Sequence, residues 1–215
     1  MKLREPVSGL THLIGAVLSV IGIVVLVYNA ATKATPWHVV SFSIFGASLI
    51  LLYTASSVYH LLTISDKGVR VLRKIDHSMI YVLIAGTYTP ICLVPLRGGW
   101  GWSLLCSIWA IAMVGIVLKL LWFDAPRWLY TAFYVIMGWL IVIAFMPLVR
   151  SMPLPAVLWL IAGGVLYSIG ALIYGTKWPR LKLKRFGFHE IFHLFVMYGS
   201  FCHFWLMFRY VLNLG

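Results

Sequence analysis

Charged residues are scarce in this chain: they make up 10% of its 215 residues, and only five of them are acidic. Long polar segments are missing too, because the connections between its apolar runs are too short to hold a soluble domain. A chain that is 62% hydrophobic cannot bury that much apolar surface in one water-soluble core. The composition therefore excludes an ordinary soluble enzyme and indicates an integral membrane protein with one domain over residues 1–215.

Cysteine is also sparse. The three cysteines, Cys92, Cys106 and Cys202, all fall within apolar runs. No two of them have the C-x-x-C spacing of a thiolate metal site or a redox pair. We therefore expect them to pack among apolar side chains, and any metal site to use other ligands.

Apolar runs dominate what is present. Seven of them are long enough to cross a bilayer. This pattern predicts an all-α integral membrane protein, a bundle of seven transmembrane helices. The predicted spans are residues 10–31, 37–62, 75–96, 100–121, 126–148, 155–175 and 187–210.

Basic residues are distributed unevenly between the two sides of these spans. One side receives thirteen of the seventeen: Lys2, Arg4, Lys67, Arg70, Arg73, Lys74, Lys119, Arg127, Lys177, Arg180, Lys182, Lys184 and Arg185. The other receives Lys33, Arg97, Arg150 and Arg209. Because cytoplasmic connections carry the excess of Lys and Arg, the amino terminus is predicted to be cytoplasmic and the carboxyl terminus extracytoplasmic. Basic connections facing anionic lipid also account for the net charge of +12 without a nucleic-acid partner.

Three histidines lie at span ends on the predicted cytoplasmic side. His189 and His193 are four residues apart, so a helix presents them on one face. At 1.5 Å per residue they lie about 6 and 12 Å beyond Arg185, while His60 lies about 10 Å before Lys67. The three thus match in depth, which is the condition for sharing one ion. We predict a zinc site held by His60, His189 and His193.

Residues 189–193 read H-E-I-F-H, the H-E-x-x-H pattern of zinc metalloproteases, with Glu190 in the position of their general base. The pattern is loose, and the helix of a soluble protease would not open a long apolar span. Glu190 is equally compatible with an interfacial charge facing the basic sixth connection.

Two further polar residues lie at a similar depth. Ser56 is one turn before His60 on the same helix face and could bond a metal-bound water or a substrate oxygen; alternatively it bonds a carbonyl of its own helix. Asp76 could offset the charge of an ion and orient or deprotonate its water. The alternative for Asp76 is an ion pair with Lys74 or Arg73. His12 and His77 fit either a supporting role beside these groups or ordinary packing.

Several dispersed motifs together resemble a known family. They are Glu5-Pro-Val-Ser-Gly-Leu-Thr-His12, Ser56-Ser-Val-Tyr-His60, Asp76-His77, Gly86-Thr-Tyr-Thr-Pro90, His189-Glu-Ile-Phe-His193 and Gly199-Ser-Phe-Cys-His203. In this order they are similar to the hemolysin III branch of the progestin and adipoQ receptor family. The resemblance implies zinc bound by His60, His189 and His193, with Asp76 reaching it through water and Ser56 lining the site. It also implies a multi-pass protein of the plasma membrane, the inner membrane in bacteria.

The family belongs to a wider group that includes alkaline ceramidases, which implies hydrolysis of lipid amides. A zinc-dependent hydrolase of lipid amides or esters fits best, because three histidines with an open fourth position form the catalytic type of zinc site. The alternative is a sensor or regulator of membrane lipid with a structural zinc. A pore-forming cytolysin fits less well with seven uninterrupted apolar spans. The expected partners are membrane lipids, including a substrate with a long acyl chain, and a homo-oligomer is possible.

Overall fold

The computed structural model describes residues 3–179 and 186–214, and these residues are mostly helical. Lys2, Arg180, Lys182, Lys184 and Arg185, which contribute to the predicted charge bias, lie outside the described residues. The helices are α1 (Pro6–Lys33), α2 (Pro36–Leu61), α3 (Asp66–Leu93), α4 (Gly99–Leu121), α5 (Arg127–Gly138), η1 (Leu140–Ala144), α6 (Phe145–Ser151), α7 (Leu154–Thr176), α8 (Phe188–Arg209) and η2 (Val211–Asn213).

Each predicted span coincides with helix in the structure. Six segments have the length and apolar composition needed to cross a membrane: α1, α2, α4, α7, Arg127–Ser151, which includes α5 and α6, and Phe188–Asn213, which includes α8. The third predicted span lies in α3, a helix of 28 residues whose polar groups, among them Asp76 and His77, lower its hydropathy. The all-helical membrane architecture is thus confirmed, while the crossing of the membrane by α3 stays a prediction.

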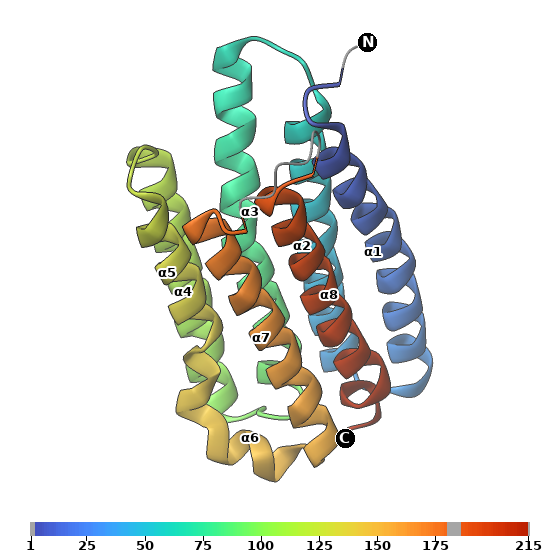
Figure 1. Cartoon of the computed structure of the whole chain (residues 1–215). Coiled ribbons are helices and arrows are strands. Elements are labelled where there is room, and N and C mark those ends of the chain that lie inside the picture. Colours follow the sequence, from blue (N-terminus) through green and yellow to red (C-terminus); the bar gives the residue numbers. More distant parts are fainter. Residues whose placement is uncertain (1–2, 180–185, 215) are drawn as a thin grey trace.

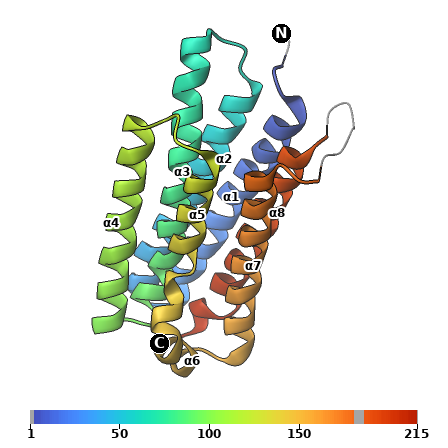
Figure 2. The ribbon, with the colours of Figure 1, turned by 60° about the vertical axis from the view of Figure 1, so that its left-hand side comes forward.

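The helices form one bundle in which neighbours in sequence are mostly neighbours in space (Figure 1). Helix α1 packs on α2, α2 on α3, α3 on α4, and α7 on α8; the last long helix also packs against the first. The amino terminus and the carboxyl terminus lie at opposite ends of the bundle. The connections α2–α3 and α4–α5 are at the amino-terminal end, as is the point where α8 begins (Figures 1 and 2).

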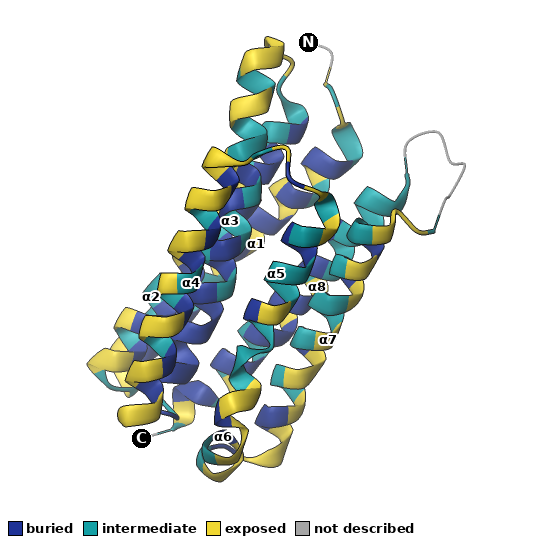
Figure 3. Ribbon diagram, turned by 90° about the vertical axis from the view of Figure 1, so that its left-hand side faces the viewer, coloured by how far each residue is buried: buried dark blue, intermediate teal, exposed yellow. Residues whose placement is uncertain are grey.

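Burial is confined to the inward faces of the helices (Figure 3). Phe42, Phe45, Ile108 and Leu206 are completely covered, whereas large apolar side chains cover the outside of α1, α4 and α7. Such a surface would be a liability in water and is what a lipid-facing bundle requires. Small residues bring helices close together: a Cβ on Gly15 of α1 would lie 2.9 Å from the Tyr53 ring of α2.

Helix α3 begins earlier than its apolar run. The Ser65 side chain accepts a hydrogen bond from the Gly68 backbone N–H at 3.3 Å, and Asp66 lies in the first turn, where a negative charge favours a helix. Four basic residues that the sequence placed in a connection, Lys67, Arg70, Arg73 and Lys74, are therefore part of α3. The helix projects beyond its neighbours at the amino-terminal end (Figure 1).

The fifth predicted span, residues 126–148, lies within one apolar segment long enough to cross a membrane, but it is not one continuous α-helix. The α-helix stops at Gly138, continues as a 3-10 turn, η1, and resumes as α6. The Tyr88 hydroxyl of α3 donates to the Gly138 carbonyl at 2.6 Å and accepts from the Ile141 N–H at 2.9 Å. Irregular backbone is tolerated at membrane depth only where its polar groups are satisfied, and Tyr88 satisfies them.

Candidate metal centre

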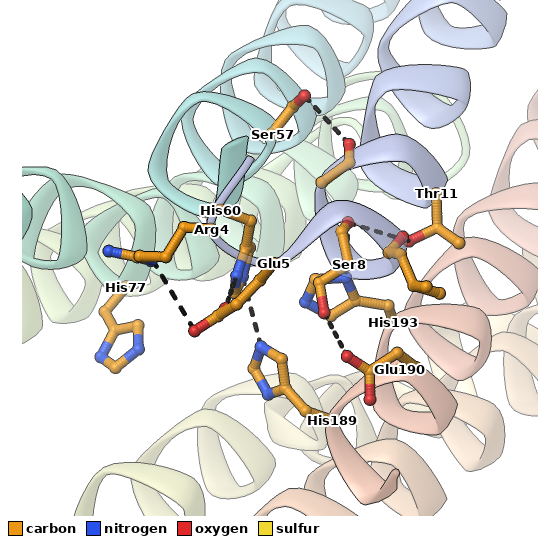
Figure 4. Close-up of polar contacts among 12 residues, drawn as sticks. Arg4, Glu5, Ser8, Thr11, Ser57, His60, His77, His189, Glu190 and His193 are labelled. Carbon is orange, nitrogen blue, oxygen red and sulfur yellow. Dashed lines mark hydrogen bonds and ion pairs between the residues drawn. The ribbon is translucent and has the colours of Figure 1, made fainter. Parts of the chain in front are cut away.

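His60, His189 and His193 meet at the amino-terminal end of the bundle, as their depths predicted (Figure 4). Each offers one ring nitrogen, and the three nitrogens lie within 4.8 Å of one another. The Nε2 atoms of His60 and His189 are 3.2 Å apart. Two nitrogens bound to one tetrahedral zinc ion at 2.0–2.1 Å are separated by about 3.3 Å. The donor type and the spacing of these residues therefore fit zinc.

The amino-terminal segment orients two of these rings. The Nδ1 of His60 is hydrogen-bonded to the Glu5 carboxylate, and because a carboxylate can only accept, Nδ1 carries the proton. The Nδ1 of His193 lies 3.3 Å from the Ser8 carbonyl oxygen, which is also only an acceptor. Both contacts leave Nε2 with a free lone pair. Outer partners of this kind fix the tautomer of a metal-ligating histidine.

Glu5 opens one of the motifs that resemble the family, but no role at the site was predicted for it. Its backbone N–H donates to the His60 carbonyl at 3.0 Å, so the chain before α1 is fastened to the end of α2 at two points. The hydrogen bond with His60 holds the pKa of the Glu5 carboxyl below its usual value. The chain has only five acidic residues, and this scarcity of carboxylates was a sequence signal for a role of Glu5.

Glu190 is engaged away from the three ring nitrogens. One carboxylate oxygen accepts from the Gly187 N–H at 2.8 Å and caps the first turn of α8; the other accepts from the Ser8 hydroxyl at 2.5 Å (Figure 4). These contacts argue against the role of general base that the H-E-x-x-H pattern suggests. The basic connection that Glu190 was alternatively expected to face lies largely outside the described residues.

Asp76 and Ser56 face each other beside the histidines. Asp76 is 8% exposed, and the Ser56 hydroxyl lies near its carboxylate. Among the described residues Asp76 forms no ion pair with Lys74 or Arg73, although the Arg73 charge is near enough to act on its carboxylate. Lys74 donates to the Leu120 carbonyl at 2.9 Å, and the Arg73 guanidinium lies over the Phe123 ring. Ser48 of the same helix bonds within its own helix instead: its hydroxyl donates to the Phe45 carbonyl at 2.7 Å.

His12 and His77 flank this group of residues. The His12 ring stacks on His193 with 3.6 Å between ring centroids and 10° between planes, and it also contacts Tyr53 edge-on. His12 therefore limits the movement of a candidate ligand by packing. His77 lies on the other side, with Nε2 3.5 Å from the Tyr174 hydroxyl.

A long cavity of about 230 Å³ leads from His189 and His193 into the bundle. Its polar end contains Ser56, Asp76, His189 and His193, and its walls are mainly apolar side chains of α3, α5, η1, α7 and α8. On α3 the lining extends from Asp76 to Ile91, about 22 Å along the helix axis. The interrupted fifth span supplies Trp139 and Ile141 to the wall. A polar end joined to an elongated apolar chamber suits an amphiphile.

These features define a class: a multi-pass helical membrane protein with a cluster of three histidines, two of them buried, at one end of a mainly apolar cavity. A family model described as haemolysin-III related matches residues 1–204. The chain is 40% identical to Hemolysin-3 of Bacillus cereus over 97% of its own length and 92% of the relative, and 42% identical to the Hemolysin-3 homolog of Bacillus subtilis over 92% and 89%. It is 24% identical to the human monocyte to macrophage differentiation factor over 81% and 72%. The chain belongs to the haemolysin-III-related family.

Proposed function

We propose that this protein is a zinc-dependent hydrolase of lipid amides or esters in a plasma membrane, the inner membrane in a bacterium. One observation carries the proposal: His189 and His193 line the polar end of a cavity whose walls are mainly apolar, and the ring nitrogen that His60 offers lies within 4.8 Å of theirs. The histidines would hold the ion and the chamber would hold an acyl chain. The carboxyl carbon of a bound lipid would then lie at the boundary between the two.

The three-histidine set leaves a fourth position for a reactant. Zinc in an open site of this type polarises a carbonyl oxygen and lowers the pKa of water to about 7. His60, His189 and His193 are the proposed ligands through Nε2, with Glu5 and the Ser8 carbonyl holding the rings of His60 and His193. Asp76, which lines the same end of the cavity, is the proposed acceptor for the proton of the attacking water.

Ser56 has a separate role in this proposal. Its hydroxyl, near the Asp76 carboxylate, would donate to that carboxylate and hold it toward the cavity, or donate to the substrate carbonyl oxygen. A proton taken up by Asp76 would then pass to the leaving amine or alcohol, as expected of a general acid and base.

The proposed orientation rests on the distribution of charge. Described basic residues of the predicted cytoplasmic group lie near the end of the bundle that carries the amino terminus and the histidines, and the carboxyl terminus lies at the other end (Figure 1). With α3 counted as a span, the chain crosses the membrane seven times. The candidate metal centre then lies on the cytoplasmic side, within reach of lipids in the inner leaflet.

The test is hydrolysis of long-chain ceramides, acyl amides and acyl esters by purified protein, compared between wild type and Asp76→Asn, with and without a chelator. Loss of a general base should lower the rate by about 10²–10⁴-fold while zinc content stays near that of wild type. Glu190→Gln should keep activity, because its contacts are with α1 and the α8 cap. Zinc-loaded wild type inert toward the whole panel would favour the sensor or regulator with a structural zinc.

A further inference from the structure

A second pocket lies beside the candidate metal centre at the same end of the bundle. Three cationic side chains line it: Arg73 of α3, Lys119 of α4 and Arg127 of α5. It shares part of its wall with the long cavity, since His77, Ile80, Tyr134 and Tyr174 line both. We call it the basic pocket.

Lys119 is the most unusual member of the basic pocket. The residue is only 4% exposed, and its ammonium lies 3.6 Å from the centroid of the Tyr130 ring and 4.9 Å from that of Phe123. Rings stabilise a cation, but they do not neutralise it. In the described part of the chain its ammonium forms no ion pair with a carboxylate. A charge buried to this degree is costly unless an anion accompanies it.

The chain has no spare anion to supply. It contains five acidic residues, and all five are described. Glu5 and Glu190 are bonded at the metal centre, and Asp76 lies beside Ser56. Asp66 is exposed in the first turn of α3 and does not line the pocket. Asp124 lines the basic pocket but is paired with Arg70, which lies outside its lining, at 2.9 Å. The pocket therefore keeps an excess of positive charge that an external anion would balance.

We propose that the basic pocket binds the phosphate headgroup of a membrane lipid whose chain enters the adjoining apolar cavity. Arginine and lysine side chains that line one pocket suit a phosphate monoester or diester, and the pocket is also lined by the aromatic residues Phe123, Tyr130 and Tyr174. The shared wall joins the headgroup position to the cavity. As a lipid-binding site the pocket does not depend on zinc; as the headgroup subsite of a substrate it rests on the proposed hydrolase.

The test uses purified, delipidated protein in neutral detergent and native mass spectrometry of bound lipid. Four probes share the same two oleoyl chains: phosphatidic acid, phosphatidylglycerol, phosphatidylcholine and diacylglycerol. We expect the two anionic lipids to bind about tenfold more tightly than the other two. Lys119→Met should reduce this preference to about the level of phosphatidylcholine, and Arg73→Gln, on a half-buried residue, gives a second variant should Lys119→Met fail to fold.

Lys67→Gln is the matched control, because Lys67 is an exposed residue of α3 outside the pocket and its loss removes the same unit charge. Equal binding of all four lipids, or an equal loss in Lys67→Gln and Arg73→Gln, would overturn the proposal. Competition by glycerol 3-phosphate that disappears in Arg73→Gln would keep the phosphate site and identify a free ester as the ligand. Each measurement is made on zinc-loaded and chelator-treated protein and set beside the hydrolysis assay. Selective binding of the anionic lipids by protein that hydrolyses none of the panel would keep the basic pocket and refute the hydrolase alone, whereas hydrolysis without that selectivity would refute the basic pocket alone.

Discussion

Removal of the Glu5 carboxylate should weaken zinc binding without removing a ligand. The substitution Glu5→Ala leaves His60 in place but takes away the acceptor for its Nδ1 proton, so the ring is free to rotate and to change tautomer. Loss of an outer carboxylate costs about 10–100-fold in metal affinity. The Glu5 side chain is 46% exposed, which allows water to take its place in part. We therefore expect the lower end of that range, about tenfold in the zinc dissociation constant.

The assay is competition for zinc between the purified protein and a chromophoric chelator, together with thermal unfolding of the zinc-free protein. Glu5→Gln, which keeps an acceptor oxygen, should fall between wild type and Glu5→Ala. Glu190→Gln is the matched control: it changes a carboxylate that bonds Ser8 and Gly187 instead of a histidine, so zinc affinity should be unchanged. A dissociation constant for Glu5→Ala within twofold of wild type would refute the reasoning. A loss that only follows lower stability of the zinc-free protein would refute it equally.

Three further results are expected. Purified protein should hold about one zinc per chain and should unfold at a lower temperature after chelation. If a variant with alanine at His60, His189 and His193 kept the zinc content of wild type, the ion would be bound elsewhere. Tyr88→Phe should lower the free energy of unfolding by about 1–3 kcal/mol, because the backbone groups of the broken fifth span lose their hydrogen-bond partner. Tyr198→Phe, on the exposed face of α8, should change that free energy little, and equal losses in the two variants would contradict the prediction. Reporter fusions should be active on opposite sides of the membrane at the two termini, and activity on one side would exclude seven crossings.

The placement of the long apolar helices follows from hydropathy, and the meeting of the three histidines follows from helical periodicity and depth. Both are local properties: a run of apolar residues specifies its own helix, and the i, i+4 spacing of His189 and His193 specifies their common face. The early start of α3 was missed because a turn rich in Lys and Arg resembles a connection, although Ser65 and Asp66 form a recognisable helix start.

The sequence contains only weak signs of the break in the helix of the fifth span. Gly138 permits a backbone change, and Pro147 cannot donate a hydrogen bond to residue 143, but either is common in membrane helices. What fixes the break is Tyr88, fifty positions earlier than Gly138, and no local pattern shows such a contact. The role of Glu5 was hidden for the same reason. Its partner His60 is 55 positions away, so only the folded chain brings them together.

The contact between Ser8 and His193 spans 185 positions of the chain and joins its first long helix to its last. During synthesis, every segment through α7 can leave the ribosome and enter the bilayer with only one of the three imidazoles available. The contacts between α1 and α8 form only when α8 has been inserted, and Glu190 then links the beginning of α8 to α1 through Ser8. Uptake of the metal would thus mark the completion of membrane insertion, and chains terminated before residue 188 should emerge without it.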